Sequence, residues 1–180
     1  GEKADGIYPL YWSEGDKIAV NGKASKALGE ASHGQTTATF TVNALLNYPY
    51  NIVYPAPAEG VKAQAEGCQV VTFPSIQAHN ANSFAEGAVP MYGYVANEGA
   101  STQLNHLAGV LRFLVQCGEG VENTTLKSMV VEVNHGSIAG NFDVDCATGD
   151  LTAHADAINT VTVSFGEAGL AVTADPTPVY

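Results

Sequence analysis

The sequence has few basic residues and no long apolar run. Of its 180 residues only seven are Lys or Arg, against 18 Asp or Glu, which gives a formal net charge of −11. Nucleic acids and anionic membranes are bound through Lys and Arg, so this balance argues against both as partners. The sequence contains no stretch of 18 apolar residues, which argues against insertion of a helix into a membrane.

Cysteine is also scarce, with only Cys68, Cys117 and Cys146, and these form no C-x-x-C pair. They are interpreted either as small buried apolar residues or, in an exported protein, as one disulfide and a spare thiol. Residues 1–6 contain no apolar leader, so either the protein stays inside the cell or, as we expect, a leader was removed from an exported protein.

Glycine and proline, by contrast, are frequent. The 19 Gly and 8 Pro residues interrupt the chain about once every seven residues, too often for long helices and suitable for short strands joined by turns. With 46% hydrophobic residues, the chain is long enough to form a core without metal or disulfide cross-links. We predict one β-sandwich domain over residues 1–174. Residues 175–180 contain Pro176 and Pro178, and they are predicted to be a linker or tail that cannot pair in a ladder.

Alternation of apolar and polar residues is the main pattern, and it predicts half-buried antiparallel strands. It occurs over residues 37–42, 138–145 and 160–165; in the second of these, Asn141, Asp143 and Asp145 are expected to face solvent. Further strands are predicted at 16–20, 50–54, 69–73, 91–95 and 170–173. The sequence therefore predicts an all-β fold, an antiparallel β-sandwich of about ten short strands with little helix.

Two segments fit both a helical and a strand pattern. Residues 104–114 and 126–133 carry apolar stripes at helical spacing, but Gly109 in the first and β-branched residues in the second favour strands. As strands they would be apolar on both faces and therefore central in a sheet. Residues 145–150 are predicted to form a hairpin loop, 134–137 and 56–60 shorter loops, and 75–89 a long irregular connection.

Motifs for catalysis are missing. No H-E-x-x-H, nucleophile elbow, dinucleotide fingerprint or Walker loop is present, so no catalytic, cofactor-binding or metal-binding residue is assigned, no cofactor is expected, and we expect no enzyme. A zinc site assembled in space from the scattered histidines and a carboxylate pair for glycoside hydrolysis both stay open. The five histidines are His33, His79, His106, His135 and His154.

A calcium site is one hypothesis for Asp143, Asp145 and Asp150, because hard cations bind several carboxylates from one loop. The alternative is that these acids are simply solvated on the outer face of a strand. Arg112, the only arginine, is interpreted as an anion clamp or, alternatively, as a surface residue packed on its neighbours or paired with one acid. Trp12, with Tyr8 and Tyr11, is either a sugar-stacking platform or the end of the core.

Five short motifs resemble the fimbrillin-like proteins of Bacteroidales. Residues 11–20 resemble a W-x-x-G-D-x-I-x-V opening, 52–56 an A-V-Y-P-A strand, and 71–77 an L-P-x-x-Q motif. Residues 90–93 fall where the family has a Met-containing segment, and residues 107–115, 126–133 and 138–144 follow the order of its later strands. The resemblance covers roughly residues 10–165.

The resemblance implies a sandwich of transthyretin-like topology, corresponding to the amino-terminal domain of a fimbrial subunit. Such proteins are exported as lipoproteins to the outer membrane surface and polymerise when a strand of one subunit completes the sheet of another. The expected function is thus a non-catalytic surface subunit or adhesin domain whose partners are other fimbrial subunits, with a host protein or glycan as a further partner. A tip, anchor or orphan subunit that does not polymerise stays open. The alternative is a carbohydrate-binding module using Trp12 and exposed tyrosines such as Tyr48, Tyr50, Tyr92 and Tyr94.

Overall fold

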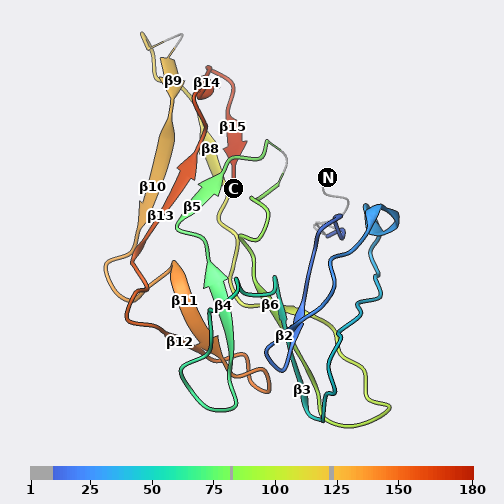
Figure 1. Cartoon of the computed structure of the whole chain (residues 1–180). Helices are drawn as coiled ribbons and strands as arrows, with labels where there is room; N and C mark the ends of the chain where they lie inside the picture. Colours follow the sequence, from blue (N-terminus) through green and yellow to red (C-terminus); the bar gives the residue numbers. More distant parts are fainter. Residues whose placement is uncertain (1–9, 82, 122–123) are drawn as a thin grey trace.

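The computed structural model describes residues 10–81, 83–121 and 124–180. Over these residues the protein folds as an antiparallel β-sandwich of fifteen short strands (Figure 1). Its only helical segment there is one turn of 3-10 helix, η1 (Glu30–Ser32). The predicted all-β architecture is confirmed, and the strands are more numerous than the roughly ten predicted. No helix in this described part is long and apolar enough to cross a bilayer.

Two sheets enclose the lower half of the molecule in Figure 1. One has the order β2-β1-β3-β6-β7, and the other has the order β12-β11-β4. Every neighbouring pair in both sheets is antiparallel. The bounds are β1 (Ala19–Val20), β2 (Lys23–Ala24), β3 (Tyr50–Tyr54), β4 (Gln69–Phe73), β6 (Met91–Val95), β7 (Asn105–His106), β11 (Gly140–Val144) and β12 (Leu151–Ala153).

The upper half contains the sheet β10-β13-β5 and two separate strand pairs, β9 with β14 and β8 with β15. The pairing of β13 with β5 is parallel, whereas β10 pairs with β13 antiparallel. Since β5 follows β4 after a two-residue break at Pro74 and Ser75, this stretch of chain connects the two halves. The bounds are β5 (Ile76–Ala78), β8 (Phe113–Val115), β9 (Thr124–Leu126), β10 (Ser128–Glu132), β13 (Thr160–Ser164), β14 (Leu170–Val172) and β15 (Thr177–Val179).

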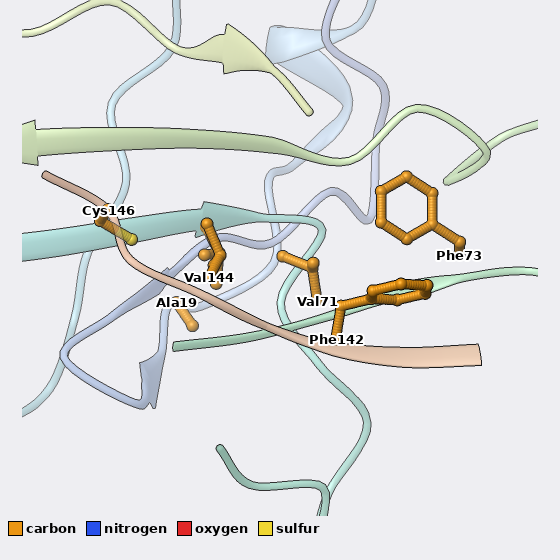
Figure 2. Close-up of a cluster of buried hydrophobic side chains, with 7 residues drawn as sticks. Ala19, Val71, Phe73, Phe142, Val144 and Cys146 are labelled. Atoms are coloured by element: carbon orange, nitrogen blue, oxygen red, sulfur yellow. The ribbon is translucent and has the colours of Figure 1, made fainter. Parts of the chain in front are cut away.

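Each half has its own hydrophobic core. The first core is formed by Ala19, Val53, Val71, Phe73, Phe142, Val144 and Cys146, of which Phe73 and Phe142 meet edge to face (Figure 2). The second core is formed by Val163, Phe165 and Val179, with half-buried side chains such as Phe113 and Met129 packed around them. The alternating pattern explains both cores, because every second residue of β11 and β13 faces inward.

The predicted strand at 37–42 is wrong. Ala38, Phe40 and Val42 are more buried than the threonines between them, as the alternation predicts, but the segment joins no sheet. One main-chain hydrogen bond, from Lys26 N–H to the Thr41 carbonyl, holds it. Phe40 packs edge to face on Trp12, with ring centroids 4.9 Å apart. The alternation of buried and exposed side chains over residues 37–42 therefore comes from side-chain packing, without pairing to a neighbouring strand.

The segments at 104–114 and 126–133 were predicted to be central strands, and this is wrong. They do contain strands rather than helices, namely β7, β8, β9 and β10. However, β10 is an edge strand, and Leu111 and Val130 have 62% and 60% of their surface exposed. Apolar residues on both faces here mark open surface rather than a sheet interior.

Two irregular segments also turn out to contain strands. Residues 177–179 were predicted to be unable to pair, yet they form β15, which pairs with β8 and buries Val179 completely. Pro178 is compatible with this position because β15 pairs on one side only, so a missing N–H breaks no ladder on its other side. The predicted irregular connection at 75–89 contains β5, which the parallel pairing with β13 stabilises.

The β1–β2 hairpin turns at Asn21, whose backbone lies in the left-handed region at φ 48°. Its side-chain amide donates hydrogen bonds to the carbonyls of Asn47 and Pro49, both 3.0 Å long, and its oxygen accepts one from Asn51 N–H at 2.8 Å. One side chain thus fixes the hairpin to the chain that enters β3.

Asn21→Gly should lower the free energy of unfolding by about 1–2 kcal/mol, because it removes these three hydrogen bonds but tolerates the positive φ. Asn21→Ala should cost about 1 kcal/mol more, since alanine is strained in this region. Urea denaturation of both variants measures the two contributions separately. Equal stability of the two variants would contradict the assigned backbone strain.

Candidate functional site

An apolar groove lies between the two cores. Its volume is about 400 Å³, and Phe73 and Phe142 of the first core and Phe113 and Val163 of the second line it. The groove is therefore the place where the two halves of the sandwich do not pack against each other.

No charged side chain lines this groove. Val131 and Val161, from the inner faces of β10 and β13, form one wall, and residues 107–111 form another. The polar side chains in the lining are Gln77, Ser137 and Tyr180. Such a surface can bury an apolar partner, but it offers no charged group for acid–base chemistry.

The backbone of residues 108–112, beside the groove, is unpaired. These residues are exposed and belong to no helix or strand, and none of their N–H or C=O groups has a hydrogen-bond partner among the described residues. Unpaired main chain next to an apolar groove is what an added β-strand needs, because main-chain bonds give affinity and alternate side chains fill the groove.

Asp143 lies in a buried polar cluster, away from solvent. It was predicted to face water, which is wrong: only 3% of its surface is exposed. Asp143 Oδ1 lies 2.6 Å from His154 Nε2, and its carboxylate accepts hydrogen bonds from the backbone N–H groups of Gln64 and Ala65. The loop that carries Gln64 and Ala65, distant in sequence, covers this face of β11, and no local pattern shows that.

The pKa of Asp143 is shifted by two opposing influences. Burial alone would raise it, but the hydrogen bonds from His154, Ala65 and Gln64 outweigh burial and hold the pKa below its ordinary value. The carboxylate is therefore ionised at neutral pH and can only accept hydrogen bonds, so His154 Nε2 carries the shared proton. Among the described residues this is the only contact between a carboxylate and a basic side chain within ion-pair distance.

The three cysteines are free thiols, so the disulfide alternative is not realised in the structure. Burial raises the pKa of the Cys146 thiol to about 12, and burial together with Asp143 and Asp145 raises that of Cys68. The thiolate is the reactive form of cysteine, so both shifts oppose a nucleophilic role. The pair Asp143–His154 thus has no activated cysteine beside it.

The acids of the calcium hypothesis serve separate structural roles. Asp143 binds the loop and His154, whereas Asp145 accepts a hydrogen bond from Ala147 N–H and Asp150 accepts one from Thr148. Over residues 10–81, 83–121 and 124–180, no three His, Cys, Asp or Glu side chains are grouped closely enough to hold a metal ion. The predicted hairpin loop at 145–150 does form, between β11 and β12.

Arg112 and Trp12 both pack on aromatic rings. The Arg112 guanidinium lies 5.9 Å from the centre of the Tyr180 ring, which corresponds to the interpretation of a residue packed on its neighbours. Trp12 contacts Phe40 and Tyr54 edge to face, so its ring belongs to an aromatic cluster rather than to an open platform. Tyr11 is exposed, and Tyr8 lies outside the described residues.

The four tyrosines proposed for glycan binding do not form one surface. In the register of β3 and β6, Tyr50 shares a face with Val95, whereas Tyr92 and Tyr94 point to the opposite face and pack against the first core. Tyr48 stacks on Tyr50 with ring centroids 4.1 Å apart. Within this stacked pair Tyr48 is exposed and Tyr50 is half-buried.

Sequence reasoning did not identify the groove, the unpaired residues 108–112 or the role of His154. The groove's residues are spread over seven segments of the chain, so no local pattern groups them. The one local signal of the groove was the apolar stripe around Leu111, whose residues do not fall on a single face of a strand. Comparison with protein-family models, with curated proteins and with solved structures finds no match in any of the three.

Proposed function

We propose that this protein is a non-catalytic structural subunit of the cell surface, a fimbrial subunit or adhesin domain that assembles by β-strand addition. The observation that carries the proposal is the uncharged apolar groove with the unpaired main chain of residues 108–112 along it. A strand from another subunit would pair with this main chain and place alternate side chains in the groove. The resemblance to fimbrillin-like proteins supports export to the outer membrane surface, with a lipid anchor in the precursor.

A carbohydrate-binding module is the second candidate, and the feature that favours it is the exposed Tyr48 ring stacked on the half-buried Tyr50. Aromatic faces are suitable for stacking on sugar rings. The groove is the larger and more apolar of the two surfaces, so assembly is the proposal that we develop.

Removing β15 tests strand addition. A chain that ends at residue 174 loses Val179 from the second core and Tyr180 from the groove lining, which exposes apolar surface. We expect oligomers that increase with protein concentration, detected by sedimentation velocity, while the circular dichroism spectrum stays that of a β-protein. A peptide of residues 175–180 added in excess should suppress these oligomers. A folded truncated chain that stays monomeric would refute the proposed assembly.

A further inference from the structure

A second unpaired segment of the chain has the properties of a donor strand. Residues 42–46 belong to no helix or strand, and none of their main-chain groups has a hydrogen-bond partner within the described residues. Leu45, in this segment, has 97% of its surface exposed, which is extreme for an apolar side chain. Burying a side chain this exposed in a contact with another molecule would be strongly favourable.

The ends of this segment are fixed although its middle is free. On one side the Thr41 carbonyl accepts a hydrogen bond from Lys26 N–H. On the other, Asn21 holds the carbonyls of Asn47 and Pro49. A segment anchored at both ends loses less conformational entropy on binding than a free tail, so it is organised in advance to be bound.

The segment is separated from the groove of its own chain. In Figure 1 the chain between η1 and β3 runs along one side of the lower half, whereas β8, β10 and β13 lie in the upper half. This segment and the strands that line the groove thus lie in different parts of the molecule. The donor segment and the groove are compatible in charge, since residues 42–51 and the groove lining both lack charged residues. Two copies that each carry a net charge of −11 can meet there without placing like charges in contact.

We propose that residues 42–46 of a second copy of this chain are the added strand, pairing with residues 108–112 and burying Leu45 in the apolar groove. This inference rests on the proposed function and names its partner. Donor and acceptor are different surfaces of one molecule, so the contact is head to tail, and a dimer keeps one free acceptor on one copy and one free donor on the other. Repetition of the contact gives a filament with a direction, or a ring if the rotation closes.

Three full-length variants test this contact by sedimentation velocity from micromolar to millimolar concentration. Leu45→Asp removes the donor anchor, and Leu111→Asp places a charge in the acceptor wall; each should weaken self-association about 10- to 100-fold, the value expected for losing one buried leucine. Val130→Asp is the matched control, because Val130 is equally exposed but does not line the groove, and it should associate as the wild type does. All three positions are exposed, so melting temperatures should stay close to that of the wild type.

Mixing the two defective variants gives the decisive result. Leu45→Asp keeps a working acceptor and Leu111→Asp keeps a working donor, so the mixture should form a one-to-one dimer that grows no further. Wild-type assembly that persists unchanged in Leu45→Asp overturns this inference and leaves strand addition standing. A wild-type chain that stays monomeric at every concentration also overturns this inference, and a folded truncated chain that stays monomeric overturns the proposed function as well.

Discussion

Asp143→Ala should lower the free energy of unfolding by about 3–5 kcal/mol, because it removes the acceptor of three hydrogen bonds to a buried carboxylate, each of which contributes about 1.5–3 kcal/mol. The substitution leaves the buried His154 side chain and the backbone N–H groups of Gln64 and Ala65 without their acceptor. It also releases the loop 61–67 from β11. Urea denaturation at pH 7 measures the loss.

The effect of this substitution should depend on pH in a defined direction. The pKa of Asp143 is lower in the folded chain than its ordinary value of 3.8, so the folded state binds the proton less tightly than the unfolded state does. The stabilisation by Asp143 is therefore complete above the unfolded pKa and is lost as the pH falls through the folded pKa. The difference between wild type and Asp143→Ala should thus be constant near neutrality and shrink below about pH 4.

Asp145→Ala is the control for this prediction. Asp145 follows the same strand two residues later, but it is exposed and its carboxylate makes one local hydrogen bond to Ala147 N–H. It should cost no more than about 1 kcal/mol. Equal losses in the two variants would show that Asp143 contributes only as a surface residue.

The second large effect is expected at Gly140, at the start of β11. Its φ of 106° lies in a region that L-residues rarely adopt, and a Cβ built there would lie 2.7 Å from the Ala157 Cα. Gly140→Ala should cost about 3–5 kcal/mol, the sum of backbone strain and of a clash that requires the backbone to move. Thermal and urea denaturation measure this loss.

Substitutions at two other glycines measure the cost of backbone strain apart from the cost of the clash. Gly136 also has a positive φ, 79°, but a Cβ there would meet nothing within 4 Å, so Gly136→Ala should cost about 1–2 kcal/mol from strain alone. Gly109 has neither feature, and Gly109→Ala should leave stability unchanged. A loss at Gly140 no larger than that at Gly136 would refute the clash with Ala157.

Strands with strong local signals could be predicted residue by residue. The predicted strands at 50–54, 69–73 and 91–95 have the same bounds as β3, β4 and β6. Each is rich in β-branched or aromatic residues and is followed within two residues by Pro, Asn or Ser. Here local preference and tertiary pairing agree.

Features that depend on distant parts of the chain could not be predicted. Asp143 follows the outward register of its strand, yet a loop 78 or 79 residues earlier in the chain covers it. Residues 37–42 alternate like a strand but have no neighbour to pair with. The groove is a gap between two cores, and a sequence pattern indicates which residues are apolar without indicating which apolar surfaces stay apart. The candidate site was missed for that reason.

The lack of Lys–carboxylate and Arg–carboxylate pairs in the described part of the chain has a consequence for assembly. The excess of carboxylates is not neutralised locally, so it generates a long-range field around each molecule, which extends roughly 30 Å at 0.01 M salt and about 10 Å at 0.1 M. Dilute buffer keeps copies apart through this field, whereas added electrolyte shortens it until the uncharged groove and loop can come into contact. Ionic strength would then promote the association of this protein, in the opposite sense to its effect on proteins that bind polyanions.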